Sequence, residues 1–287
     1  MILSRTTFLA AIVAAIFVGL MLGGAKGQAS RPPAPRPSGP PRPYVRLSPA
    51  HDFKKNNAVV HVLTRRRRVA MTFDDGPDPR WTPRFLDLLR RYDARATFFD
   101  IGRHVQSYPD LVRREAGEKH EVANHTYNHS PLTMLPIEEI RHQVDAGADA
   151  IAATGVPRPT LFRPPRGYFD KRVGQAVADA NETMVDWDRP MDPMIRRNGA
   201  HRAAQVVLRH ITQGGIILAH DGSLHPHRTF TATRLILRGL AKRGYEVVTV
   251  SELLGIDSGR RAPAWLINSP AQLTGIEPPL DDILLLP

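Results

Sequence analysis

Between residues 59 and 254, short apolar runs alternate with longer stretches whose apolar residues recur at helical spacing. The short runs predict strands; they cover residues 69–73, 96–101, 161–163, 183–187, 215–220 and 245–250. The longer stretches predict amphipathic helices; they cover residues 82–92, 111–116, 136–154, 200–212 and 229–243. The first of these helices has an apolar side made of Phe85, Leu86, Leu88 and Leu89.

This alternation predicts an α/β fold in which helices wrap a parallel sheet. With about seven strands, a distorted (β/α) barrel is favoured over an open sheet, and we expect one domain over residues 59–255. Functional side chains of such folds gather at the carboxyl ends of strands. Polar residues that directly follow a predicted strand are therefore the first candidates for a functional site.

The first thirty residues resemble an export signal rather than part of this domain. Arg5 precedes an apolar or small-residue run, Phe8–Leu22, and small residues suited to cleavage follow. This run is shorter than the roughly twenty residues of a spanning helix, which favours a cleaved signal peptide over a retained membrane anchor. Both readings place the domain outside the cytoplasm, in the periplasm or secreted, and a retained segment would attach it to the inner membrane.

Residues 31–58 are predicted to be a Pro/Arg-rich linker. Residues 31–49 show no helical or strand periodicity, and such composition favours an extended stalk of roughly 50–60 Å. At the other end, residues 256–287 are expected to form a tail outside the domain.

Composition limits the chemistry and the partners. The chain has no cysteine, which excludes Cys nucleophiles, Fe–S clusters and Cys-type zinc sites, so any metal must be held by His and carboxylate. The formal net charge is +11. Because the chain is expected to be exported, nucleic acid is not favoured as the partner of these basic residues. The remaining explanations are an anionic envelope surface as the partner, or a solvated basic flank without a partner. The sequence carries no signal for an oligomeric state.

Two adjacent carboxylates, Asp74 and Asp75, follow the strand predicted over residues 69–73. Neighbouring strand residues point to opposite faces, so both can serve one site only if the chain leaves extended geometry there. Gly76-Pro77 provides that exit. Because two adjacent carboxylates repel each other, we expect a nearby cation. The alternative is an Asp-rich turn that caps the helix beginning at Thr82.

His125 and His129 stand four residues apart, and on a helical turn this spacing brings both imidazoles to one side. Two imidazoles and one carboxylate give a catalytic zinc three protein ligands and leave a position for water. A His-x-x-x-His pair is also common as two surface histidines. Asn124 and Thr126 suit a tight, hydrogen-bonded turn around His125.

Arg163 and His220 also follow predicted strands. Arg163 lies in a Pro/Gly turn, where a guanidinium can pair with a carboxylate and hold it ionised but does not transfer protons. His220 comes after the apolar run 216–218. The alternatives are an ordinary Pro-rich loop and a core histidine with satisfied hydrogen bonds. His225 and His227 are candidates for the rim of a cleft.

Taken together, these motifs resemble the ordered motifs of the polysaccharide deacetylase family, carbohydrate esterase family 4. The resemblance rests on Thr72-Phe-Asp-Asp-Gly-Pro77, His125-Thr-x-x-His129, Arg163-x-Pro-x-Gly167 and Leu218-x-His220. Further matches are Ala96-Thr-Phe-Phe99, Ala123-Asn-His-Thr126 and the closing residues 245–254. It covers about residues 67–254. The family includes chitin, chitooligosaccharide (nodulation) and peptidoglycan deacetylases.

The resemblance implies a metal-dependent hydrolase that removes N-acetyl groups from N-acetylglucosamine-containing oligo- or polysaccharides and releases acetate. Its partner would be an acetylated amino-sugar glycan. A divalent metal, zinc in the first place and cobalt as the alternative, would be bound by Asp75, His125 and His129. The catalytic roles would fall to Asp74 as general base, Arg163 as the residue that orients it, and His220 as general acid. Leu218 would line the acetyl pocket.

Two departures from the family pattern concern the substrate and the acid. Arg166 stands where the family usually has an aromatic residue, so we expect it to form a different wall of the sugar groove. The Asp-Trp pair that normally positions the acid histidine is degraded. Asp192 is the predicted partner of His220, with Asp186 and Asp188 as alternatives.

Two other functions would leave a different set of residues. A stalked glycan-binding module without activity would be expected to lose metal ligands or the base. An amidohydrolase acting on a small non-sugar amide would be expected to lose the histidine pair. This chain keeps all of these residues, so the deacetylase is favoured.

Overall fold

The structure is a computed structural model that describes residues 44–50, 53–222 and 225–256. The predicted signal peptide or anchor over residues 1–30 lies outside the described residues, as does the predicted tail beyond Ile256. Among the helices in the described ranges, none is long and apolar enough to cross a membrane.

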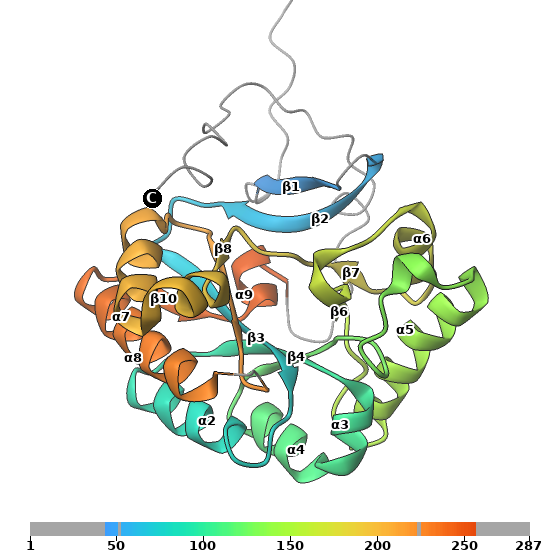
Figure 1. The fold of residues 1–287 in the computed structure, drawn as a ribbon, viewed down its shortest axis with the longest axis horizontal. Helices are drawn as coiled ribbons and strands as arrows, with labels where there is room; N and C mark the ends of the chain where they lie inside the picture. The colour runs from blue at the N-terminus through green and yellow to red at the C-terminus, as the bar shows by residue number, and fades with distance from the viewer. Residues whose placement is uncertain (1–43, 51–52, 223–224, 257–287) are drawn as a thin grey trace, which may run out of the picture. The chain divides into compact units, whose positions relative to one another are not determined.

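A parallel sheet forms the centre of the fold and curls into part of a barrel, with helices along its outer side (Figure 1). The strands, in spatial order, are β7 (Thr183–Met184), β6 (Leu161–Phe162), β5 (Glu121–Asn124), β4 (Ala96–Asp100), β3 (Arg68–Gly76), β9 (Ile216–His220) and β8 (Arg189–Pro190). A further strand, β10 (Glu246–Val248), pairs with the start of β3. All of these pairings are parallel. The predicted distorted (β/α) barrel is confirmed.

The helices cover the sheet in chain order. They are α2 (Thr82–Arg91), α3 (Gly102–Ser107), α4 (Pro109–Gly117), α5 (Ile137–Ala152), α6 (Lys171–Asp179), α7 (Asp192–His210), α8 (Pro226–Lys242) and α9 (Val250–Leu254), with short turns η1 (Leu132–Met134) and η2 (Pro165–Gly167). Each predicted helix is present. The helix predicted over 200–212 is the second part of α7, which begins earlier and is interrupted at Gly199, where φ is 77°.

The core lies on both faces of the sheet, as the period of two along a strand requires. On β4, Phe98 packs outward with Phe73 and Phe85 beneath the helices, the Phe73 and Phe98 ring centroids being 5.1 Å apart. The next residue, Phe99, points into the curl, among Val59 and other buried aliphatic residues. One apolar cluster on each face of the sheet thus holds it in place.

An antiparallel hairpin, β1 (Tyr44–Ala50) and β2 (Phe53–Leu63), precedes the sheet. The prediction that residues 31–49 contain no strand is therefore wrong for β1. β1 pairs with β2 through backbone hydrogen bonds, which do not require an alternating pattern of side chains. Proline is tolerated because β1 is an edge strand. β2 joins the fold through bridges from Val59 to Val185 and from His61 to Gly215. The hairpin thus crosses the expected boundary at residue 59, and the domain limits stay predictions.

Candidate metal and catalytic site

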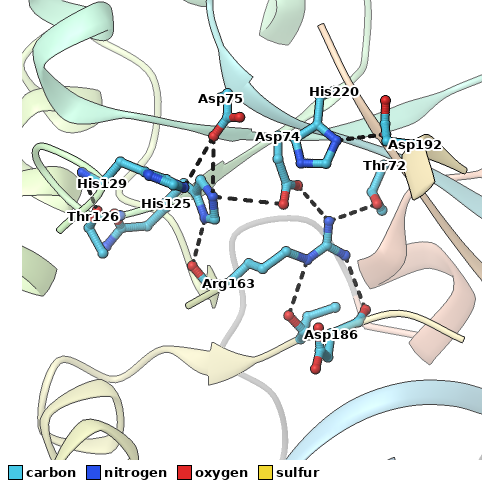
Figure 2. Close-up of polar contacts among 12 residues, drawn as sticks. Thr72, Asp74, Asp75, His125, Thr126, His129, Arg163, Asp186, Asp192 and His220 are labelled. Carbon is cyan, nitrogen blue, oxygen red and sulfur yellow. Dashed lines mark hydrogen bonds and ion pairs between the residues drawn. The ribbon is translucent and has the colours of Figure 1, made fainter. Parts of the chain in front are cut away.

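The candidate residues come from the carboxyl ends of four strands that are neighbours or near neighbours in the sheet. Figure 2 shows their side chains converging on one region. Asp74 and Asp75 lie just before the last residue of β3, His125 follows β5, Arg163 follows β6, and β9 ends in His220. The expected clustering at this edge is therefore observed, from segments that lie far apart in the sequence.

Asp74 and Asp75 both face the site because the chain leaves extended geometry between them. Asp75 has a left-handed backbone (φ 70°), and the register between β3 and β4 shifts between Asp74 and Gly76. As a result, Asp74 Oδ2 lies 3.8 Å and Asp75 Oδ1 lies 3.6 Å from Nε2 of His125. The predicted break in the strand is confirmed.

A candidate metal site is formed by Asp75, His125 and His129, whose ligand atoms all lie within 4.8 Å of one another. Asp75 Oδ1 is 3.4 Å from His129 Nε2. The assumption that the two histidines share a helical turn is wrong. They lie in a loop in which Thr126 (φ 70°) and His129 (φ 63°) adopt left-handed backbones. The loop brings the imidazoles together as a helix would have done, with ring centroids 5.0 Å apart.

The donor atoms of this site suit a divalent cation. Asp75 Oδ1 is buried and has no hydrogen-bond partner among the described residues. His125 Nδ1 lies 2.7 Å from the carbonyl oxygen of Arg163; because a carbonyl only accepts, Nδ1 carries the proton and Nε2 presents its lone pair to the site. Burial lowers the pKa of His125 to about 3, which keeps the ring neutral, the form that binds metals.

Arg163 is completely buried and is fixed by acceptors on several sides. Its Nη1 donates to Asp74 Oδ1 at 2.6 Å and to Thr72 Oγ1 at 2.8 Å. Nε and Nη2 donate to the carbonyl oxygens of Val185 and Asp186 at 3.3 and 3.1 Å. Burial raises the pKa of Asp74 above its usual value, and the charge of Arg163 limits that rise. The guanidinium thus orients Asp74 and favours its ionised form.

His220 lies on the same side of the site and contacts Asp192, the partner preferred from the sequence. His220 Nδ1 is 2.7 Å from Asp192 Oδ2. Burial alone would lower the pKa of His220, but the hydrogen bond to Asp192 and the charges of Asp74, Asp192 and Asp75 together raise it to about 9. The ring is therefore a cation at neutral pH, with a proton to donate.

The two alternative partners of His220 make other contacts. Asp188 Oδ2 lies 2.8 Å from His61 Nδ1, and its Oδ1 accepts from the backbone N–H of Ile216. Asp186 is partly buried beside the Gly167 turn, and its backbone carbonyl accepts from Arg163. Among the described residues, Asp192 is the one of the three whose carboxylate contacts His220.

Leu218 and Arg166 were expected to touch the substrate, and this stays a prediction. Leu218 is buried on β9 two residues before His220. Arg166 is exposed in η2, with a left-handed backbone (φ 60°). Of the two histidines proposed for the rim, His227 packs edge-on against Trp81, with ring centroids 4.6 Å apart, and His225 is the N-cap residue of α8.

The sequence motif that contains Thr72 predicts no separate role for this residue. Its hydroxyl accepts from Arg163 Nη1 and donates to the carbonyl oxygen of Ile217. It therefore ties the guanidinium to β9. Its position two residues before Asp74, on the same face of β3, is the signal that could have indicated this role.

Comparisons with known proteins agree on one family. A family model described as polysaccharide deacetylase matches residues 61–185. The chain is 41% identical over 190 residues to a peptidoglycan-N-acetylglucosamine deacetylase of Bacillus cereus, covering 65% of this chain and 87% of that protein. It is 35% identical over 200 residues to a chitooligosaccharide deacetylase of a Bradyrhizobium species, covering 65% and 90%. A solved peptidoglycan N-acetylglucosamine deacetylase superposes with a TM-score of 0.66 at 28% identity, covering 70% and 94%.

Proposed function

The chain belongs to the polysaccharide deacetylase family, carbohydrate esterase family 4, and from this premise we propose that it removes N-acetyl groups from an N-acetylglucosamine-containing glycan in a metal-dependent reaction. Peptidoglycan and chitooligosaccharide are the proposed substrates, and acetate is the product. The observation that carries the proposal is the meeting, at one sheet edge, of a metal-type donor set, a buried carboxylate–arginine pair and a cationic histidine.

Asp75, His125 and His129 would hold the metal, and their two nitrogen donors and one oxygen donor favour zinc, with cobalt as the alternative. When bound, such a metal polarises the acetyl carbonyl and acidifies the attacking water. The chain contributes the geometry of the donors. The hydrogen bond from His125 Nδ1 to the Arg163 carbonyl fixes that ring with Nε2 toward the site.

Asp74 is the proposed general base. Arg163 holds its carboxylate ionised beside the donor set, so it can take a proton as water attacks the acetyl carbon. The carbon–nitrogen bond then breaks, and His220 gives its proton to the departing nitrogen. The products are acetate and a free amine. Asp192 keeps the Nδ1 side of His220 occupied, so the proton is delivered from Nε2.

An N-acetyl group is favoured over an O-acetyl ester because of His220. An amine anion is a far worse leaving group than an alkoxide, so amide cleavage needs a positioned acid more than ester cleavage does. The test compares N-acetylglucosamine oligomers and peptidoglycan with acetylated xylan at equal acetyl concentration. We expect acetate mainly from the amino-sugar glycans. A clear preference for xylan would overturn the proposed substrate class but not the proposal that the protein is a metal-dependent hydrolase.

The proposed location is outside the cytoplasmic membrane, periplasmic or extracellular. The apolar run Phe8–Leu22 and the Pro/Arg-rich tract after it support this, and an envelope glycan would be found there. A reporter that is active only after export should be active when it is fused after Pro49. Activity of a cytoplasmic reporter alone at the same position would refute export.

A further inference from the structure

We propose that Glu182, a buried carboxylate outside the catalytic set, is a positioning residue that fixes the His125–His129 loop by orienting the side chain of Asn124. The inference rests on the proposed function in one respect, namely that this loop supplies two metal ligands. Glu182 lies directly before β7. Nothing in the proposed chemistry uses it.

Glu182 is 2% exposed, and its carboxylate faces Asn124, two strands away in the sheet. Asn124 Nδ2 lies 3.1 Å from Glu182 Oε1 and 3.0 Å from Oε2. Within the described part of the chain, Glu182 forms no ion pair with a basic side chain. A buried carboxylate without such a partner is costly, so its contact with Asn124 is its main compensation.

The surroundings of Asn124 allow one orientation of its amide. The carbonyl oxygen of Val144, 2.8 Å from Nδ2, only accepts, and the backbone N–H of Thr126, 3.0 Å from Oδ1, only donates. Of the two Nδ2 protons, one goes to Val144 and the other is shared by the Glu182 oxygens. Asn124 is fully buried, so removing Glu182 would leave that second N–H without an acceptor.

The fixed Asn124 side chain in turn positions the proposed metal ligand His129, through hydrogen bonds of Thr126. Thr126 has a left-handed backbone (φ 70°), which is strained for a β-branched residue. Its N–H is held by Asn124 Oδ1, and its hydroxyl accepts from the N–H of His129 at 2.9 Å. The chain of contacts therefore runs from Glu182 through Asn124 and Thr126 to His129.

The packing of α5 against this turn leaves little room for an alternative arrangement. A Cβ on Gly147 would lie 2.3 Å from Asn124 Oδ1 and 2.9 Å from the carbonyl carbon of Thr126. The backbone oxygen of Asn124 also accepts from the N–H of Arg163 at 3.0 Å. A shift of Asn124 would thus disturb both the histidine loop and the strand end that carries Arg163.

The test measures metal affinity without substrate. The metal-free protein is titrated with Co²⁺, and both the dissociation constant and the visible absorption of the bound ion are recorded. Glu182→Met keeps length and removes both acceptors, whereas Glu182→Gln keeps one. We expect Glu182→Met to weaken Co²⁺ binding by about 10–100-fold, the scale of outer contacts to metal ligands, and to change the absorption spectrum. Glu182→Gln should recover a large part of the affinity.

The matched control is Glu121→Met. Glu121 is a carboxylate on the same strand as Asn124, but it accepts from Thr97 and Ser251, away from the histidine loop. We expect this variant to lose thermal stability and to bind Co²⁺ within about twofold of the wild type, as for independent sites.

Wild-type affinity in Glu182→Met, or an equal loss in Glu121→Met, would overturn the positioning role and leave the proposed function intact. Failure of the wild-type protein to bind Co²⁺ would instead overturn the metal site, and the positioning role with it. Circular dichroism of each variant establishes that a folded protein is compared.

Discussion

Nη1 of Arg163 lies 2.6 Å from Oδ1 of Asp74, and both side chains are almost entirely shielded from solvent. The guanidinium also has acceptors in Thr72, Val185 and Asp186, so its position does not depend on Asp74 alone. Such a pair can hold a carboxylate ionised beside a cation site without making it a ligand. This separates the roles of Asp74 and its neighbour Asp75.

Exchanging each carboxylate for its amide tests that separation. Asp74→Asn should lose at least about a hundredfold in acetate release, the scale of general-base catalysis, while zinc content stays near that of the wild type. Asp75→Asn should lose zinc and activity together, because it removes one of three donors. Elemental analysis and initial rates on the same samples provide the measurement. If Asp74→Asn lost zinc and Asp75→Asn kept it, the two roles would be reversed.

Removing Arg163 should cost stability as well as rate. Arg163→Met leaves Asp74 buried without its partner, and breaking a buried pair from one side costs about 3–5 kcal/mol. The free energy of unfolding, measured with denaturant on metal-free protein, gives the cost. Adding Asp74→Asn to this variant removes the orphaned charge and should return part of the loss. If the losses in free energy of unfolding of the two single variants simply added up in the double variant, the two residues would not be a coupled pair.

Asp192 should set the alkaline limit of activity. The pKa of His220 is raised to about 9, and the acid form is the cation, so kcat/KM should fall as pH rises through about 9. Asp192→Asn removes a charge that favours the His220 cation, so the alkaline fall of kcat/KM should move to lower pH. The pH profile of kcat/KM from wild type and variant measures this shift. An alkaline limb that stays in place in Asp192→Asn would show that another group is responsible.

His220→Ala should distinguish amide from ester cleavage. Without the acid, departure of an amine is slowed far more than departure of a good alkoxide, so hydrolysis of N-acetylglucosamine oligomers should fall by about 10²–10⁴-fold. Hydrolysis of an activated acetyl ester should fall much less. Equal losses on both substrates would mean that His220 serves binding or folding rather than proton transfer.

The edge of the sheet where the site forms could be predicted because Asp74, Arg163 and His220 each lie at or just after the end of a predicted strand. Asp74 lies near the end of a nine-residue strand, and His220 ends a five-residue strand with four buried positions. Two strands of the central sheet, β5 and β8, were missed because they have too few apolar residues to give a pattern. β5 has four residues, and β8 consists of Arg189 and Pro190 alone.

Backbone conformation was the other part that sequence did not provide. The spacing of His125 and His129 fits a helical turn, but the chain instead has left-handed backbones at Thr126 and His129. Glycine is the residue that usually indicates such a backbone in a sequence, and neither position is a glycine. The sequence did not indicate Glu182 because its partner Asn124 lies 58 positions away, and only the folded sheet brings the two together. The partner of His220 could be narrowed to three carboxylates, and the fold brings Asp192 to it.

The most direct test of a metal-dependent N-deacetylase is acetate release from N-acetylglucosamine oligomers and peptidoglycan by one protein preparation in three states. These are the protein as purified, the protein after chelation and dialysis, and the chelated protein supplied with zinc or cobalt. We predict activity in the first state, none in the second and recovery in the third, with His125→Ala inactive in all three because it lacks a ligand. Full activity of the chelated, metal-free protein would contradict the account.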